Sequence, residues 1–321
     1  VGDSASAWRS GTPFAPMRVL LANHHLISRS GSELVCLEIG TSLIERGHSV
    51  GVFTFHRGPI SDALAAAGAQ VFTPRDVDAL RAFAPDVLHV HHASCLAFLG
   101  SLGLDAACVH SCLGALPALE APPPVWAGVA LGLAVSEEVR DRMAASPFGE
   151  AVPLAINRNW FDDRGLARPD PSARPVRRVA VVTNHLDPRL AGLLDARGVA
   201  RSLIGAPGNV RVVEAQTLLA FDAVVTIGRT AILAGALGIP CLLADVHGSD
   251  GLLAPETFDA LASVNFSGRH KAGPITLEPL LGPAVDLRAV QDRVWRDHRL
   301  SDRATWLEET YARLAKGTVR M

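Results

Sequence analysis

The chain has 321 residues, 49% of them hydrophobic and 5% aromatic, and its formal net charge is −2 at pH 7. This length suits two domains of ordinary size, and so apolar a composition excludes a chain that is disordered overall. A net charge near zero argues against a protein that binds nucleic acid or a membrane surface through bulk electrostatics. No apolar run approaches the roughly 20 residues that span a bilayer, so we expect no transmembrane segment.

The N-terminal segment and the cysteines indicate where the protein resides. Residues 1–16 are mostly small and polar, and we interpret them as an extension that precedes the folded domains. They lack the charged and then apolar pattern of a secretory signal peptide. The five cysteines are an odd number in mostly apolar surroundings, which suits reduced thiols. Together these features predict a cytoplasmic protein.

Strands and helices alternate along the first half of the chain. Met17–Ala22 has the composition of a buried strand, Glu33–Arg46 that of an amphipathic helix closed by Gly47, and Ser49–Phe55 that of a second strand. Four further strands are predicted at residues 70–72, 86–90, 107–110 and 132–135. Such alternation predicts a parallel sheet with helices on both faces.

A segment without periodicity separates the two halves. Residues 164–178 are rich in proline and arginine, as domain linkers often are. We therefore predict a first α/β domain over residues 17–166, a linker over residues 167–178 and a second α/β domain over residues 179–321. Amphipathic helices are expected between residues 285 and 316.

The second half is organised around the stretch Phe221–Leu253. A buried strand ends at Ile227, Gly228 breaks it, and a helix follows that Gly238 is placed to end. In an open α/β sheet such a turn presents free N–H groups of the helix to an anion. Arg229 adds a full positive charge to the turn. An ordinary strand–helix crossover with an exposed arginine is the alternative interpretation.

The first half resembles the N-terminal domain of GT-B glycosyltransferases, especially the large family-4-like group. The resemblance rests on short elements that come in the same order: Ser30-Gly31-Ser32-Glu33, Arg46-Gly47-His48, Pro85 to His92, Val109-His110-Ser111, Ala134 to Glu137 and Ala155-Ile156-Asn157. It implies two doubly wound, Rossmann-like α/β domains that face each other across a cleft. The first domain would hold the acceptor and the second a nucleotide-sugar donor, and the C-terminal helices would pack back on the first domain.

The second half departs from the chemistry of that group. The arginine and lysine that grip the donor diphosphate in the family correspond here to His185 and Leu190. Two glutamates that bind the donor correspond to Val225 and Leu233, neither of which accepts a hydrogen bond. The glycine between these two positions is retained as Gly228. The donor site is therefore either rebuilt from other groups or lost.

Several residues are candidates for a rebuilt site, although for each cation a solvated surface side chain is the alternative. The predicted donor- and phosphate-binding residues are Gly31, His185, Arg189, Gly228, Arg229, Thr230, His247, Gly248, Ser249, Glu256 and Arg269. Two residues are assigned catalytic roles. Asp250 lies in a glycine-bearing loop where a sugar would be read, and the resemblance places His110 beside the reacting sugar.

Histidines and cysteines in the first half raise the question of a metal site. His24, His25, His89, His91, His92 and His110 occur with Cys95, Cys108 and Cys112. Their spacing matches no zinc-ligand pattern, and His91 and His92 are expected on opposite faces of a strand end. GT-B enzymes usually need no metal. We therefore predict no metal ion and no cofactor other than the nucleotide-diphosphate sugar, which is a substrate.

The sequence thus predicts a glycosyltransferase that moves a sugar from a nucleotide-diphosphate donor to an unidentified saccharide, lipid or small-molecule acceptor. The resemblance implies transfer of a hexose with retention of configuration. A homodimer is left open. Two alternatives remain: a catalytically silent GT-B protein that acts as a binding or partner subunit, and a sugar-nucleotide epimerase-like enzyme, which shares the architecture.

Overall fold

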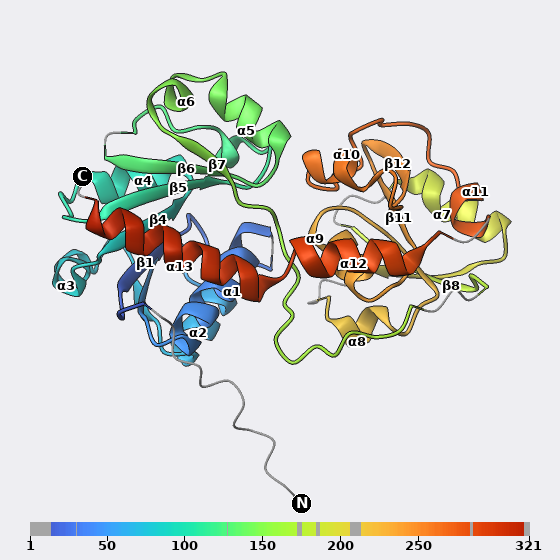
Figure 1. Ribbon diagram of the computed structural model, residues 1–321, viewed down its shortest axis with the longest axis horizontal. Coiled ribbons are helices and arrows are strands. Elements are labelled where there is room, and N and C mark those ends of the chain that lie inside the picture. The colour runs from blue at the N-terminus through green and yellow to red at the C-terminus, as the bar shows by residue number, and fades with distance from the viewer. Residues whose placement is uncertain are drawn as a thin grey trace, which may run out of the picture. The chain divides into compact units, whose positions relative to one another are not determined.

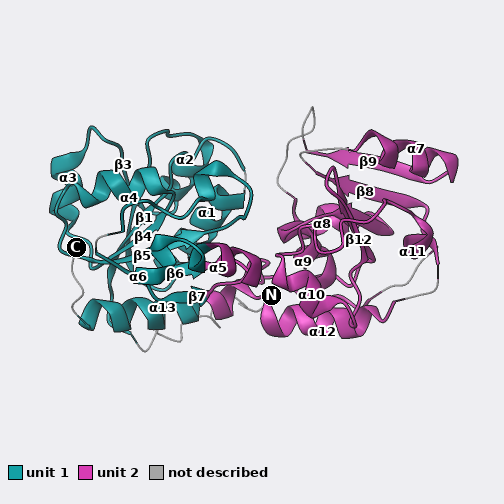
Figure 2. Ribbon diagram, turned by 90° about the horizontal axis from the view of Figure 1, so that it is seen from above, with its two compact units in different colours: residues 1–133, 143–155, 304–321 teal, residues 134–142, 156–303 magenta. Residues whose placement is uncertain are grey.

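The computed structural model describes residues 14–29, 31–126, 128–171, 175–183, 187–205, 213–282 and 285–317. They form two compact units, coloured separately in Figure 2. The first contains the described residues up to 133 together with residues 143–155 and those from 304 onward, and the second contains residues 134–142 and 156–303. Residues 134–142 of the second unit lie within the range expected for the first domain, and its main segment begins at residue 156, before the expected linker at residues 167–178.

The first unit is built on a seven-stranded sheet with the order β3-β2-β1-β4-β5-β6-β7 (Figure 1). Its strands are β1 (Arg18–Ala22), β2 (Ser49–Phe53), β3 (Gln70–Phe72), β4 (Val87–His91), β5 (Ala107–Cys112), β6 (Val129–Ala134) and β7 (Leu154–Ile156). The pairs β2–β3, β1–β2, β1–β4 and β4–β5 are parallel. Parallel neighbours need a crossover, and helices supply it.

Helices follow most strands of the first unit. They are α1 (Gly31–Glu45), α2 (Pro59–Ala66), α3 (Val77–Phe83), α4 (Ala93–Gly100), the short 3-10 turn η1 (Ala118–Glu120), α6 (Pro147–Ala151) and, from the end of the chain, α13 (Leu300–Lys316). Most of α5 (Glu137–Ala144) belongs to the second unit. The predicted alternation of strands and helices is confirmed in this half.

The second unit contains a five-stranded sheet with the order β12-β11-β10-β8-β9. Its strands are β8 (Arg178–Val182), β9 (Ala200–Ile204), β10 (Ala223–Thr226), β11 (Cys241–Asp245) and β12 (Gly248–Leu252). Its helices are α7 (Pro188–Ala196), α8 (Ala215–Leu218), α9 (Arg229–Ala236), α10 (Phe258–Ser263), α11 (Glu278–Leu281) and α12 (Leu287–Asp297). The strand expected near residue 211 falls outside the described residues.

One expected loop of the second unit is a strand. The sequence predicts a polar loop over Asp245–Gly251, but Gly248–Leu252 forms β12, which pairs antiparallel with β11. The register shifts between Leu243 and Ala244, as at a bulge. β12 is therefore an edge strand added to an otherwise parallel sheet.

Both faces of the second sheet are covered by apolar side chains. Val224 and Leu243 belong to one apolar cluster, and Val225 and Leu242 belong to the other. Successive side chains of a strand point to opposite faces, so a strand buried on both faces is apolar throughout. This is why the sequence of β10 contains no alternating polar positions.

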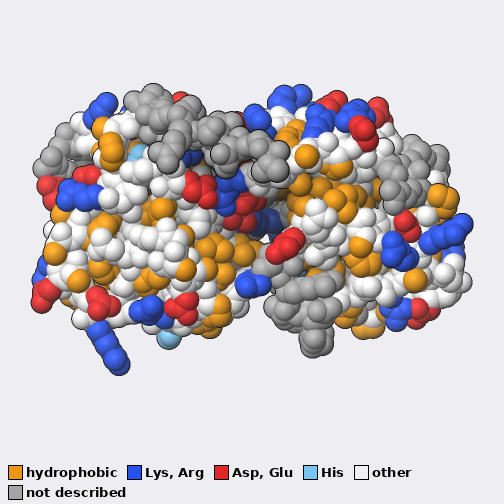
Figure 3. All heavy atoms as spheres, turned by 90° about the horizontal axis from the view of Figure 1, so that it is seen from below, with side chains coloured by type: hydrophobic (Ala, Val, Ile, Leu, Met, Phe, Trp, Pro, Cys, Tyr) orange, Lys and Arg blue, Asp and Glu red, His pale blue; other side chains and the backbone are white. Residues whose placement is uncertain are grey.

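Charged side chains of both signs lie on the surface of the protein (Figure 3). On the face shown in Figure 3, Lys and Arg side chains lie among Asp and Glu, in keeping with a net charge of −2. Within the described ranges, no helix combines the length and the hydrophobicity that crossing a bilayer requires.

A buried ion pair holds α13 against the first sheet. Glu308, 1% exposed, accepts hydrogen bonds from Arg46 at 2.6 Å and from Nε2 of His48 at 2.7 Å. Nδ1 of His48 accepts the N–H of Met17 at 3.1 Å, so the ring proton lies on Nε2 and faces the carboxylate. The Arg46-Gly47-His48 turn thereby connects the start of β1 to the last helix.

We predict that Glu308→Ala lowers the free energy of unfolding by about 3 kcal/mol, because it leaves the imidazole N–H buried without its acceptor. Denaturation in urea measures the change. Glu309→Ala removes the neighbouring exposed carboxylate and should change stability by less than about 0.5 kcal/mol. Equal effects of the two substitutions would contradict a structural role for Glu308.

Candidate functional site

The candidate site of the first unit lies where the order of its strands reverses. β1 pairs with β2 on one side and with β4 on the other. Ligands of open α/β sheets bind outside the carboxyl ends of the strands at such a point. His24 and His25 follow β1, and His92 follows β4. The residues available at this position are therefore imidazoles.

His92 is fixed in one orientation by its neighbours. Its Nδ1 accepts the N–H of His24 at 3.1 Å, which leaves the ring proton on Nε2. Nε2 lies 3.4 Å from Oε1 of Glu120, whose other oxygen accepts the N–H of Leu113 at 2.7 Å. The φ angle of His92 is 78°, which costs on the order of 1–3 kcal/mol in a residue other than glycine.

Such strain is concentrated at functional sites, so the His92–Glu120 pair is a candidate for function. Sequence reasoning named His92 only as a doubtful metal ligand and missed Glu120. The two residues are brought together by η1, a short turn after β5 that has no distinctive sequence pattern.

His110, the predicted catalytic histidine, does not reach this edge. Its side chain is 1% exposed and its ring centroid lies 5.7 Å from that of Phe148. β5 continues past it to Cys112. Burial lowers the pKa of His110 to about 3, so its ring stays neutral near neutral pH. The catalytic role that the resemblance gave to His110 stays a prediction.

Gly31 begins α1 and remains open to a ligand. No atom lies within 4 Å of the position that a Cβ would take. Glu33, in contrast, is turned back on the loop, where its carboxylate accepts the backbone N–H of Ser28 at 2.7 Å and the Ser28 hydroxyl at 2.6 Å. The glutamate of this motif closes the loop, and the glycine leaves the helix start accessible.

The second sheet also reverses its strand order, between β8 and β10. Gly228 follows β10 and caps α9 with a φ of 61°, a conformation that favours glycine. No atom lies within 4 Å of its potential Cβ. Arg229 and Thr230 are the first two residues of α9 and are half-buried. His185, predicted to lie nearby, falls outside the described residues.

Arg229 lies over an aromatic ring. Its guanidinium carbon is 5.7 Å from the ring centroid of Trp160, which is 1% exposed. A cation–π contact of this kind contributes roughly 0.5–2 kcal/mol. The arginine predicted to bind diphosphate is therefore positioned beside the Gly228 turn by a tryptophan that the sequence analysis did not consider.

The other two predicted cations form ion pairs within the second unit. Arg189 bonds to both carboxylate oxygens of Asp187, which also caps α7, although the arginine side chain is 76% exposed. Arg269 lies 2.8 Å from Glu138 and is 19% exposed. Each would have to exchange or share its partner to bind a phosphate, which lowers the gain from binding.

Asp250 is an anchor for a loop. Its carboxylate accepts the backbone N–H groups of His270, Lys271 and Ala272 at 3.0, 2.7 and 3.3 Å. The side chain is 4% exposed. The Asp250 carboxylate therefore holds the loop at residues 270–272, and its role in reading a sugar stays a prediction.

Of the three predicted site residues that directly precede Asp250 in the chain, two are buried and one is exposed. Ser249 donates its hydroxyl to the carbonyl of Leu243 at 3.0 Å and is 7% exposed. Gly248 is buried, and a Cβ there would clash with Ala272 and Gly273. Among the predicted site residues of this stretch, only His247 presents an exposed side chain. The site residues expected in this stretch therefore reduce to His247.

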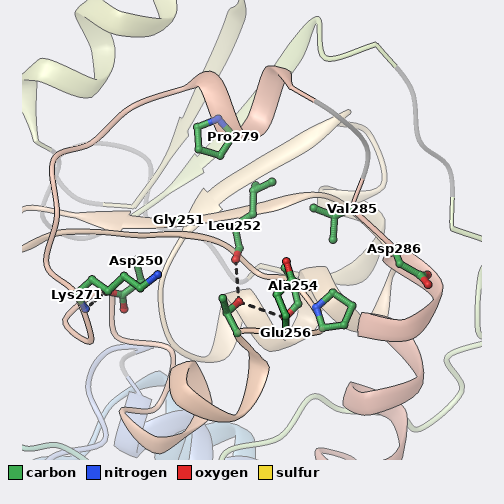
Figure 4. A pocket seen from close by; sticks show the side chains of 11 residues that line it. Asp250, Gly251, Leu252, Ala254, Glu256, Lys271, Pro279, Val285 and Asp286 are labelled. Atoms are coloured by element: carbon green, nitrogen blue, oxygen red, sulfur yellow. Dashed lines mark hydrogen bonds between the residues drawn. The ribbon is translucent and has the colours of Figure 1, made fainter.

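Glu256 lies on a separate pocket, shown in Figure 4. This pocket has a volume of about 530 Å³ and is bordered by β12, with Lys271 and Asp286 also in its lining. Gly228, Arg229 and His247 are not among its lining residues. The predicted donor-binding role of Glu256 stays a prediction.

The positions that correspond to the two family glutamates lie in the apolar layers. Val225 is fully buried in β10 and Leu233 packs against the apolar cluster on the opposite face. Both positions therefore belong to the apolar core, and neither carries a polar group.

Several histidines of the first half lie close together: the ring centroids of His24 and His25 are 5.8 Å apart, and those of His89 and His91 are 4.8 Å apart. All five cysteines are buried thiols outside any disulfide. In the part of the chain that is described, no three His, Cys, Asp or Glu side chains are arranged to hold a metal ion.

No protein-family model matches the chain, and no curated protein matches it. Solved structures do resemble it. A glycosyltransferase from Rickettsia africae matches with a TM-score of 0.61 and 11% identity, over 95% of this chain and all of the other. HepE from Anabaena, solved with UDP and glucose, matches with a TM-score of 0.59 and 14% identity, over 92% of this chain and 99% of the other. This chain has the GT-B fold.

The GT-B fold also relates the chain to WaaB, a lipopolysaccharide outer core galactosyltransferase. That structure has a TM-score of 0.55 and 12% identity, and the match covers 94% of this chain and all of the other. The fold class predicted from the sequence is confirmed, whereas membership of family 4 stays a prediction. At these identities the comparisons establish the GT-B fold and not the reaction.

We predict that the buried histidines make the protein sensitive to acid. Burial lowers the pKa of His89 from 6.5 to about 4 and that of His110 to about 3. Only the unfolded chain takes up their protons between pH 6.5 and about 4. The free energy of unfolding should therefore fall as the pH falls, by about 1.4 kcal/mol per pH unit for each group.

Melting temperatures across this pH range measure the effect. His110→Leu should flatten the dependence, because one buried titrating group is removed. His270→Leu, at an exposed histidine, should leave it unchanged. An acid slope that is the same in both variants would argue against this assignment.

We predict that Asp250→Asn loosens the loop at residues 270–272, because an amide oxygen replaces only part of the carboxylate's acceptor capacity. The loss should be about 1.5–3 kcal/mol. Hydrogen exchange of the amides of His270 and Lys271 measures it. Asp259→Asn, at an exposed carboxylate of the same unit, is the control. Unchanged exchange in Asp250→Asn would show that the Asp250 carboxylate does not hold this loop.

Proposed function

We propose that this protein is a metal-independent glycosyltransferase that uses a nucleotide-diphosphate sugar. Support comes first from the fold, which it shares over nearly its whole length with glycosyltransferases. The observation that carries the proposal is the open glycine turn at Gly228, at the point where the second sheet reverses its strand order. HepE holds UDP in its structure, and UDP is accordingly our first choice of ligand.

The turn suits a diphosphate for electrostatic reasons. The first N–H groups of a helix have no partner within the helix, and the helix dipole adds a partial positive charge. Glycine at the N-cap lets phosphate oxygens approach the backbone closely. Arg229, held beside the turn by Trp160, would add a charge-assisted hydrogen bond. These groups would stabilise the negative charge that develops on the leaving diphosphate.

The remaining parts of the proposal rest on the resemblance of the first half to family 4. They are transfer of a hexose, retention of configuration and an acceptor bound by the first unit. In this proposal Gly31, at the start of α1, is a donor- and phosphate-binding residue. A cytoplasmic location and a homodimer are kept as expectations.

A catalytically silent GT-B protein is the second candidate, and specific contacts favour it. Arg189 and Arg269 are already paired with carboxylates, and Asp250 is occupied by backbone amides. Val225 and Leu233 leave no polar group at the two glutamate positions. A protein with these features could bind a partner through the same fold without turning over a donor.

We predict that Gly228→Val weakens UDP binding at least tenfold, because the side chain fills the space above the helix start. Calorimetry with UDP measures the affinity. Gly198→Val is a matched control, since Gly198 has a φ of 65° against 61° for Gly228 and equally open surroundings. The control also places a β-branched residue at a positive φ, beyond the end of α7, and should keep the affinity of the parent.

Two results would overturn the proposal. Parental UDP affinity in Gly228→Val would remove the turn from the donor site. Absence of binding and of donor hydrolysis by the parent protein, tested with a panel of nucleotide sugars, would favour the silent protein.

A further inference from the structure

Four imidazoles gather at the carboxyl edge of the first sheet. We call His24, His25, His56 and His92 the edge histidines. The ring centroid of His24 lies 5.8 Å from that of His25, 5.4 Å from that of His56 and 6.5 Å from that of His92. His25 stacks on His92 at 6.0 Å. They come from the ends of three neighbouring strands, β2, β1 and β4.

Much of the hydrogen-bonding capacity of these rings is unused. Nδ1 of His24 is bonded to the hydroxyl of Ser94 at 2.8 Å, and both nitrogens of His92 have partners. For the rings of His25 and His56, the described residues supply ring contacts but no hydrogen bond. His24 and His25 are half-buried and His56 is exposed. Up to three imidazoles can therefore donate to one ligand.

The charges around the edge histidines favour an anion. Arg29 and Arg57 lie on the same two loops and are exposed. The nearby carboxylates are already engaged: Glu33 by Ser28, Glu120 by His92 and the amide of Leu113, and Asp62 by Arg57 at 3.5 Å. α4 also begins at Ala93, directly after His92, and directs the positive end of its dipole to this edge.

The surroundings of His24 oppose its protonation. The pKa of His24 is lowered by burial first and then by the charges of His25, His56 and His92. A bound anion offsets this repulsion and favours the protonated rings. Binding of an anion at this position should therefore be coupled to uptake of protons.

We propose that the edge histidines bind a phosphate monoester carried by the acceptor. The tetrahedral phosphate offers three oxygens to imidazoles that approach from three strands. Its second ionisation, near pH 6, falls in the range where histidines titrate, so a proton is readily shared between them. The identification of the ligand as an acceptor rests on the proposed function, whereas binding of a phosphate monoester does not.

Calorimetry with phenyl phosphate tests the proposal on the full chain. Affinity should be about tenfold higher near pH 6 than near pH 8, since protonated rings make charge-assisted hydrogen bonds. Titrations in two buffers of different ionisation enthalpy should reveal proton uptake. The double variant His25→Gln, His56→Gln should lose about tenfold or more in affinity at the lower pH.

Two controls separate this site from the rest of the protein. His270→Gln replaces an exposed histidine of the second unit and should leave phenyl phosphate binding unchanged. The double variant should bind UDP as the parent does. If the parent itself does not bind UDP, that result counts against the proposed function and not against this site. Equal phenyl phosphate affinities of parent and double variant would overturn the inference.

A second pair of experiments locates the source of the phosphate. Binding to vesicles of phosphatidylcholine with phosphatidic acid, and not to phosphatidylcholine alone, would indicate a lipid-borne phosphate. Binding of phenyl phosphate without vesicle binding would indicate a soluble acceptor. Binding to neither probe would contradict the proposal.

Discussion

The parallel pairing of β1 with β4 and of β8 with β10 forces the loops after these strands to leave each sheet at one edge. Everything proposed for this protein follows from that constraint. His24 and His92 are 68 residues apart in the chain, yet the backbone N–H of one bonds to the ring of the other. In the second sheet the same geometry exposes the helix start at Gly228 beside the end of β8.

The sequence was sufficient to predict the fold class and most strands, because apolar periodicity is local, but β7, β9 and β12 were not predicted. It did not reveal which polar residues lie inside a strand. His110 and His92 both occur near strand ends, but two more residues of β5 follow His110, whereas His92 lies just beyond β4. Both side chains are buried, at 1% and 2% exposed, but only His92 lies past the end of its strand, where its ring contacts His24 and Glu120.

Long-range pairing was equally hidden. The glycines and polar residues of Gly248–Leu252 are typical of a loop, and only pairing with β11 makes that segment a strand. Arg229 meets Trp160, and Arg269 meets Glu138, across long separations in the chain. No local pattern identifies these partners, so each arginine resembled a free cation. Glu120 was missed for the same reason.

Tyr311 supplies a partner from the end of the chain to the centre of the first sheet. Its hydroxyl lies 2.5 Å from Nδ1 of His89, whose other nitrogen is bonded to Ser111 at 2.6 Å. All seven strands of that sheet have been synthesised by residue 156. During translation, Nδ1 of His89 therefore lacks the hydroxyl of Tyr311 until the whole second unit has been synthesised. Domains usually fold as units from the N-terminus, but here the first unit is completed last.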